Sequence, residues 1–233
     1  MTDGPIAKLV AAYPDFLASH DANTLMWKDG TCMILDDGKG EKDPETRLNE
    51  PDIKDMFYVP YPKAAAAFRQ NLIAIQAVRY QPFFDKMYGN CEKGEVKPKL
   101  VHVDWLPHHG GGALRVTSVN KVADRFGAVS AELDKLPDSF VKYVVPLASK
   151  GYNCRAIAGT TRASAHGHDI AIDINVAWAN YWRYRRTEAG SYSYENRVPW
   201  EIVEVFEKHG FIWGGKWYHY DTMHFEYRPE LLL

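Results

Sequence analysis

The chain of 233 residues has little that would tie it to a nucleic acid or to a membrane. Its formal net charge is −2 and it has no basic run, so the sequence gives no reason to expect attraction to a phosphate backbone. No apolar stretch is long enough to cross a bilayer. The N-terminus carries no basic segment ahead of an apolar core, and we therefore do not interpret it as a signal peptide. The composition is ordinary for a globular protein.

Cysteine is scarce, with three residues far apart in the sequence: Cys32, Cys91 and Cys154. They show no CxxC spacing, which argues against a structural zinc knuckle. An odd number allows at most one internal disulfide, and a bridge between Cys91 and Cys154 is one option that the sequence leaves open. Cys154 precedes Arg155, but nothing around it resembles the arrangement that activates a cysteine nucleophile.

Periodicity predicts an α+β fold, with a small, largely antiparallel sheet flanked by helices. Apolar residues at helical spacing predict helices over Pro5–Ser19, Val116–Leu136 and Pro199–His209. Leu25–Leu35 is expected to be a strand or hairpin, because Lys28, Asp29 and Gly30 interrupt it. The charged segment Asp36–Asp52, which contains Gly and Pro, is expected to be a long loop. No internal repeat is evident.

Two short segments place metal-binding side chains on the polar face of a predicted strand. In Ile170–Ile174 the isoleucines alternate with Ala171 and Asp173, so Asp173 should point away from the apolar face. In Met223–Tyr227 the same alternation puts His224 and Glu226 together on the polar side. If the two strands lie close in one sheet, Asp173 and His224 converge.

His166 lies seven residues before Asp173, in a predicted loop that leads into the strand, and completes a set of three ligands with His224. Two imidazoles and one carboxylate suit a catalytic zinc ion, which keeps a fourth position open. Asp221 is the candidate general base, provided that a turn or bulge redirects its side chain toward the ligands. Glu226 is the expected acceptor for an imidazole N–H, which would fix the orientation of the ring.

The other histidines of the nine are expected to bind no metal. His168 forms an HxH pair with His166 that could chelate an ion by itself, but the three-ligand set already fills a catalytic zinc site, so His168 should only line the site. The remaining six are interpreted as structural or surface residues: His20, His102, His108, His109, His209 and His219.

The two segments together resemble a known family. SAHGHDIAID (Ser164 to Asp173) is similar to the SxHxxGxAxD signature, and DTMHFE (Asp221 to Glu226) to the (E/D)xxH signature, of the zinc D-alanyl-D-alanine carboxypeptidases and dipeptidases. That family includes L-alanyl-D-glutamate endolysins and shares its fold with the hedgehog signalling domain. The resemblance covers chiefly Val116–Leu233. It implies that His166, Asp173 and His224 are zinc ligands and that Asp221 is the catalytic carboxylate.

The same resemblance suggests residues that contact the substrate. Within YNCRAIAGTTRASAH, Arg155 falls where the family has an arginine that faces the reacting centre, and Arg162 is a second candidate. A guanidinium there would bind the substrate carboxylate or the oxyanion that develops on the attacked carbonyl; the alternative for each is an ordinary surface arginine. Ser164 also matches and is assigned to substrate binding. Asp169 replaces the glycine of the signature, a position that normally needs a tight or positive-φ backbone.

Aromatic residues are concentrated between the two signatures and could either wall a substrate groove or fill the core, with the core slightly favoured. The cluster comprises Trp178, Tyr181, Trp182, Tyr184, Trp213, Trp217, Tyr218 and Tyr220.

Taken together, the resemblance implies a peptidase with one zinc ion that acts on the stem peptide of peptidoglycan, most simply as a D-Ala-D-Ala carboxypeptidase. Its implied partner is a peptide, with no nucleic acid and no membrane span, and its implied location is periplasmic or extracellular. Residues 1–115 would be an extension packed on a catalytic core of residues 116–233. The alternatives are a non-catalytic zinc-binding module, an L-Ala-D-Glu endopeptidase, and a zinc hydrolase of an unrelated substrate.

Overall fold

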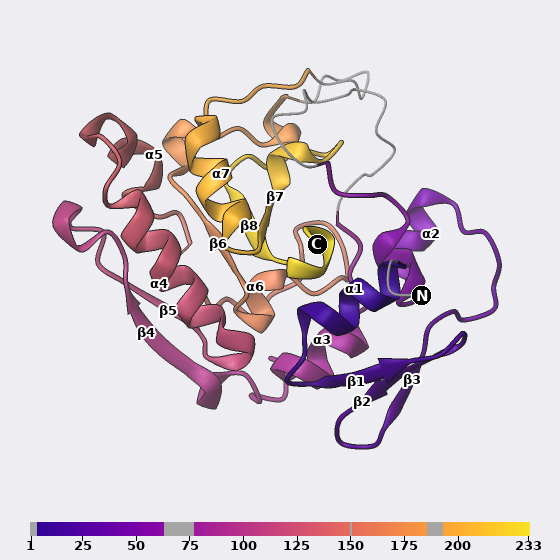
Figure 1. Ribbon diagram of the computed structural model, residues 1–233. Coiled ribbons are helices and arrows are strands. Elements are labelled where there is room, and N and C mark those ends of the chain that lie inside the picture. Colours follow the sequence, from indigo (N-terminus) through magenta and orange to yellow (C-terminus); the bar gives the residue numbers. More distant parts are fainter. Residues whose placement is uncertain (1–3, 63–76, 150, 186–192) are drawn as a thin grey trace.

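The computed structural model describes residues 4–62, 77–149, 151–185 and 193–233. Short helices surround three small antiparallel sheets in this part of the chain, which confirms the α+β class (Figure 1). The helices are α1 (Pro5–Ala12), α2 (Pro44–Asn49), α3 (Gln81–Tyr88), α4 (Val122–Leu133), α5 (Val141–Val144), α6 (Ala165–His168) and α7 (Trp200–Lys208). None of the helices in these ranges combines the length and apolar character that a membrane span requires.

The strands pair into three separate sheets in the order β1-β2-β3, β4-β5 and β6-β8-β7. They are β1 (Leu17–His20), β2 (Thr24–Trp27), β3 (Cys32–Ile34), β4 (Leu100–Asp104), β5 (Ala113–Thr117), β6 (Ala171–Asp173), β7 (Phe211–Trp213) and β8 (His224–Tyr227). The predicted hairpin over Leu25–Leu35 is therefore confirmed as β2 and β3. The two segments with metal-binding side chains are neighbouring antiparallel strands, β6 and β8.

One face of the β6-β8-β7 sheet is closed by aromatic packing. Phe225 of β8 stacks on Phe206 of α7 with ring centroids 3.8 Å apart, and Phe211 of β7 contacts Phe126 of α4 at 4.4 Å. All four rings are fully buried. Side chains alternate across a strand, so burial of Phe225 sends its neighbours His224 and Glu226 to the opposite face, as the sequence predicted. The helices α4 and α7 thus pack against one face of the sheet, and the opposite face carries the metal-binding side chains.

Two predicted helix boundaries differ from the structure. The first helix ends at Ala12 rather than Ser19, because the residue before Pro14 is disfavoured in the helical region. The predicted helix over Val116–Leu136 is wrong in its first turns: β5 continues to Thr117, and Asn120 and Lys121 have positive φ, so α4 begins at Val122.

The expected loop Asp36–Asp52 contains the helix α2. Asp43 caps this helix by accepting hydrogen bonds from the backbone N–H groups of Glu45 and Thr46, and Pro44 occupies its first turn, a combination that favours a helix start. The predicted helix over Pro199–His209 is confirmed as α7, and Gly210 follows it with a φ of 93°.

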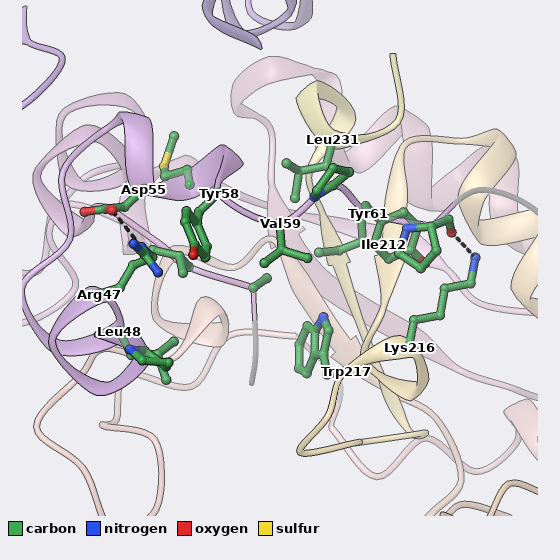
Figure 2. A pocket seen from close by; sticks show the side chains of 16 residues that line it. Arg47, Leu48, Asp55, Tyr58, Val59, Tyr61, Ile212, Lys216, Trp217 and Leu231 are labelled. Atoms are coloured by element: carbon green, nitrogen blue, oxygen red, sulfur yellow. Dashed lines mark hydrogen bonds and ion pairs between the residues drawn. The ribbon is translucent and has the colours of Figure 1, made fainter. Parts of the chain in front are cut away.

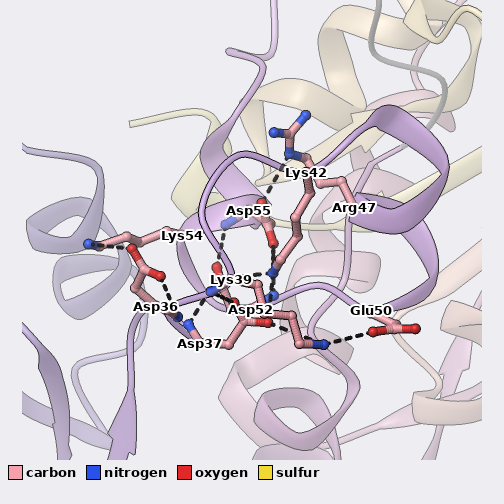
Figure 3. Close-up of polar contacts among 10 residues, drawn as sticks. Asp36, Asp37, Lys39, Lys42, Arg47, Glu50, Asp52, Lys54 and Asp55 are labelled. Atoms are coloured by element: carbon pink, nitrogen blue, oxygen red, sulfur yellow. Dashed lines mark hydrogen bonds and ion pairs between the residues drawn. The ribbon is translucent and has the colours of Figure 1, made fainter.

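A buried lysine organises the segment that precedes and follows α2 (Figure 3). The Nζ atom of Lys42 lies 2.6 Å from Asp55, 3.0 Å from Asp37 and 3.2 Å from Asp52. Burial alone would lower the pKa of Lys42, but these carboxylates raise it above its usual range. The ammonium group therefore stays charged and offsets part of the negative charge of these three carboxylates.

The N-terminal part packs on the C-terminal part. In Figure 1 the indigo helix α1 lies beside the yellow C-terminal segment. The hydroxyl of Tyr13 donates to Glu230 at 2.7 Å, and both residues are buried. A disulfide joins Cys91 to Cys154, the pairing that the sequence left open, and Cys32 is a free, exposed cysteine. The division at residues 115 and 116 stays a prediction; that position lies inside β5.

Candidate active site

Three potential metal ligands meet at the polar face of the β6-β8 pair. Asp173 ends β6 and stands opposite His224, the first residue of β8. His166 comes from α6, a single helical turn that replaces the predicted loop and is capped by the side chain of Ser164. One nitrogen or oxygen atom from each of the three residues lies within 4.8 Å of the others. The sequence prediction thus names side chains that the fold brings together.

The carboxylate of Asp173 lies between the two imidazoles. Its Oδ1 atom is 2.9 Å from Nδ1 of His224, and its Oδ2 atom is 3.2 Å from Nε2 of His166. Burial alone would raise the pKa of Asp173, but the two histidines hold it well below the usual range. Burial would lower the pKa of His224, and hydrogen bonding to Asp173 and Glu226 raises it to about 10.

The donor set fits a zinc ion. Nε2 of His166 is buried and forms no hydrogen bond with the described residues, although Oδ2 of Asp173 lies 3.2 Å from it. Its Nδ1 atom lies 3.2 Å from the backbone carbonyl of Gly151, a contact that selects the tautomer with a free Nε2 lone pair. Nδ1 of His224 and a carboxylate oxygen of Asp173 complete an N/N/O set. A buried, unpartnered nitrogen beside a carboxylate is what a bound cation would satisfy.

Glu226 lies behind His224, on the side away from Asp173. Its Oε2 atom is 3.3 Å from Nε2 of His224 and accepts a hydrogen bond of 2.6 Å from Nη1 of Arg79. Its Oε1 atom accepts from Arg228 at 3.1 Å. Burial alone would raise the pKa of Glu226, but the neighbouring cations, Arg79 above all, hold it well below the usual range. The charged carboxylate can therefore fix the orientation of the His224 ring, the role expected of it.

Asp221 is brought to the same site by a turn. The backbone N–H of His224 donates to the carbonyl of Asp221 at 3.2 Å, and the strand begins only at His224. Burial first, and then the charge of Asp173, raise the pKa of Asp221 to about 7. Its Oδ1 atom is buried without a hydrogen-bond partner among the described residues. A carboxylate with a free oxygen and a raised pKa is suited to accept a proton.

A single groove with about 810 Å³ of empty space is lined by His166, Asp173, Asp221 and His224. Arg155 lines it from an exposed position, and its charge lowers the pKa of Asp221 slightly against the larger effect of burial. Ser164 lines it as well, although its side chain also caps α6. Arg162 does not line the groove but a cavity beside it.

The aromatic cluster divides between groove and core. Tyr181, Tyr184 and Trp217 line the groove, and the ring of Trp217 lies 5.5 Å from that of His224. Trp213 and Tyr220 are buried. Some members of the cluster therefore form the wall of the groove, and others fill the core.

Other histidines lie outside the ligand group. Nε2 of His168 lies 2.6 Å from Asp85, and His209 contacts Glu132 at 2.9 Å. His108 pairs with Asp134 on the surface. Asp36, Asp37 and Asp52 form a second group with the spacing of metal ligands, but the Lys42 ammonium already lies against two of these carboxylates.

Arg79 is the residue of the site that sequence reasoning missed. It lines the groove and contacts Glu226 across 147 positions of the chain, and no local pattern around it indicates this. A further cavity, with about 700 Å³ of empty space, adjoins the groove at Trp217 and is mainly apolar, with Tyr58, Val59 and Ile212 in its wall (Figure 2).

Comparison with known proteins bears on the segment that holds the ligands. Neither the curated proteins nor the solved structures gave a match. A family model described as D-alanyl-D-alanine carboxypeptidase matches residues 158–227, which include His166, Asp173, Asp221 and His224. The resemblance drawn from the two signatures is thereby confirmed: over this segment the chain matches the zinc peptidase family of the D-alanyl-D-alanine carboxypeptidases.

Proposed function

We propose that the protein is a zinc-dependent peptidase that cleaves D-Ala-D-Ala-like peptide bonds in the stem peptide of peptidoglycan. The observation that carries the proposal is one groove that holds both an N/N/O donor set and a separate carboxylate, Asp221, with an unpartnered oxygen. A site that only stored a metal would have no need of that second carboxylate. The family match supports the peptide substrate.

His166, Asp173 and His224 would hold the ion. When bound, zinc supplies a Lewis acid that polarises a carbonyl and makes a water molecule more acidic. Asp221 accepts the proton of the attacking water as a C–O bond forms at the scissile carbonyl. It then donates this proton to the amine nitrogen as the C–N bond breaks, which leaves a carboxylic acid and a free amine.

Arg155 would act at the carbonyl oxygen or at the terminal carboxylate of the peptide. Its guanidinium lines the groove from an exposed position, where two N–H groups can face one oxyanion. Glu226 and Arg79 would act through His224, since Glu226 contacts that ring and Arg79 contacts Glu226.

We further propose that the protein works outside the cytoplasm, because the Cys91–Cys154 disulfide is of the kind that persists in an oxidising compartment. This agrees with a cell-wall substrate.

The test measures zinc content and release of D-alanine from peptides that end in D-Ala-D-Ala, and in parallel from purified peptidoglycan. Asp221→Asn should keep the ion and lose about 10²–10⁴-fold in kcat, the usual contribution of a general base. His166→Ala should lose both zinc and activity. Asp15→Asn changes an exposed carboxylate in the same way and serves as the control.

The outcomes separate the alternatives. Zinc bound without release of any product by the wild type would refute the peptidase activity on this substrate and leave the binding module and the hydrolase of an unrelated substrate. Release of internal fragments rather than D-alanine would favour an endopeptidase. Full activity of Asp221→Asn would refute the assignment of the base.

A further inference from the structure

A second cavity lies beside the groove and has two arginines and a histidine in its wall. It has about 690 Å³ of empty space, and its wall includes Arg79, Arg162 and His168. Among the described lining residues the one acidic side chain is Glu50, which is exposed and lies 2.7 Å from Lys39. Arg79 is paired with Glu226, His168 with Asp85 and Glu50 with Lys39, which leaves Arg162 as the charged side chain of this wall without an ion-pair partner among the described residues.

The cavity and the groove share their walls. Arg79 lines both. The chain from Ala156 to Ala163 forms a narrow turn closed by a bridge between those two residues, with Ile157 on the groove and Arg162 on the cavity. Only the turn from Ala156 to Ala163 separates the two spaces, so a side chain of a peptide bound in the groove can reach the cavity by extending past this turn.

Among the described residues, Arg162 has no ion-pair partner of the kind that a half-buried arginine normally has. Its Nε atom is buried and none of these residues accepts a hydrogen bond from it, and none of their carboxylates lies within ion-pair distance of its guanidinium. Burial first, and then the like charges of Arg79 and Arg183, lower its pKa. By contrast, Arg79 has an ion pair with Glu226. Arg162 is thus a cation with unused donors in a cavity wall.

His168 contributes a second unsatisfied atom to the same wall. Its side chain is almost completely buried, and its Nε2 atom lies against the Asp85 carboxylate at 2.6 Å. Its Nδ1 atom is buried without a partner among the described residues. With Nε2–H donating to Asp85, Nδ1 is an acceptor, and a peptide N–H next to a bound carboxylate would satisfy it.

We propose that this cavity is a specificity subsite for a carboxylate side chain of the peptide held in the groove, with Arg162 as its principal ligand and Arg79 as the shared wall. The inference deepens the proposed function and rests on it. A guanidinium suits this task because its N–H donors match the geometry of a carboxylate, and a charged acceptor strengthens each hydrogen bond. A glutamine in place of glutamate would keep the size of the side chain and lose the charge.

The experiment uses zinc-loaded full-length protein and non-cleavable peptides in which a CH₂–NH group replaces the last amide of a D-Ala-D-Ala end. Pairs of peptides carry Glu or Gln at one of the three positions upstream, and calorimetry gives the Kd of each. At one position the Glu peptide should bind about tenfold more tightly or better. Arg162→Gln should reduce that preference to less than about twofold.

Two further variants test whether the preference for Glu depends on the paired donors of Arg162 rather than on positive charge in general. Arg162→Lys keeps the charge without the paired donors and should retain part of the preference. Lys135→Gln removes an exposed positive charge elsewhere and should retain all of it. Equal binding of Glu and Gln peptides at every position, or a preference that survives Arg162→Gln, would overturn the proposal.

Cleavage of matched all-amide peptides is measured separately. Cleavage without any preference for Glu would support the proposed function and refute the subsite. If the protein prefers the Glu peptide through Arg162 but cleaves neither peptide, the result would support a site for anionic peptides and refute the peptidase activity.

Discussion

Replacing Asp169 by asparagine should stabilise the protein at neutral pH. The Asp169 side chain is fully buried, and neither carboxyl oxygen has a hydrogen-bond partner among the described residues. Burial raises its pKa from the ordinary 3.8 to about 8, although Arg115 acts in the opposite direction. The folded protein therefore holds a proton that the unfolded chain releases between these values. The contribution of Asp169 to the free energy of unfolding therefore falls as the pH rises from about 4 to about 8.

The size of the effect follows from the two pKa values. Each pH unit in this window costs about 1.4 kcal/mol, so Asp169 lowers the free energy of unfolding by about 2.7 kcal/mol between pH 5 and pH 7. At pH 7 its total cost relative to an uncharged group is about 4 kcal/mol. Asparagine has the same shape, carries no charge and tolerates the positive φ of 57° found here.

The assay is urea unfolding of the oxidised chain at pH 5 and pH 7. Asp169→Asn should be the more stable protein at pH 7, and its stability should differ less between the two pH values than that of the wild type. Asp15→Asn, at an exposed site, should change neither quantity. The reasoning is refuted if Asp169→Asn keeps the whole pH dependence of the wild type, or if it is less stable at pH 7.

Three more predictions concern the disulfide, a helix cap and the ligand set. Loss of the disulfide in Cys91→Ser/Cys154→Ser should cost about 4 kcal/mol in urea unfolding, given a separation of 63 positions, whereas Cys32→Ser should cost less than about 0.5 kcal/mol. Asp43→Ala removes the cap of α2 and should cost about 1 kcal/mol by the same measurement. Zinc added at 100 times its Kd to metal-free wild type should stabilise it by about 2.7 kcal/mol, read from the thermal unfolding midpoint, and His166→Ala should show no shift; a shift there would contradict the ligand set.

Local patterns in the sequence predicted the strands of the site well. The alternation in Ile170–Ile174 and Met223–Tyr227 depends only on which side chains face the core, and one residue of slip would reverse every side chain. It therefore also predicted the faces of Asp173 and His224.

Local patterns failed where a few residues carried two signals. Val116 and Val119 fit the helical spacing of α4, yet Val116 belongs to β5, because pairing with β4 outweighs that spacing. The cap signal at Asp43 and Pro44 was present in the sequence and overlooked within a charged segment.

Other features had no local signal at all. Arg79 reaches Glu226 through tertiary packing, and the free donors of Arg162 are visible only once the surrounding carboxylates are placed. The positive φ of Asp169 could be inferred from the glycine of the signature, but the burial of its carboxylate could not.

The ion pair between Arg79 and Glu226 has a consequence for transplanting this site into another scaffold. The segment that matches the family carries the three potential metal ligands and Asp221, but Arg79 lies outside it. A graft of residues 158–227 alone would move Glu226 without either of its arginines, because Arg228 also lies outside the segment, whereas Arg162 would move with the graft. Arg79 belongs both to the wall of the proposed subsite and to the contacts behind His224, so a substitution of Arg79 designed to change the substrate preference would also alter the orientation of the His224 ring through Glu226.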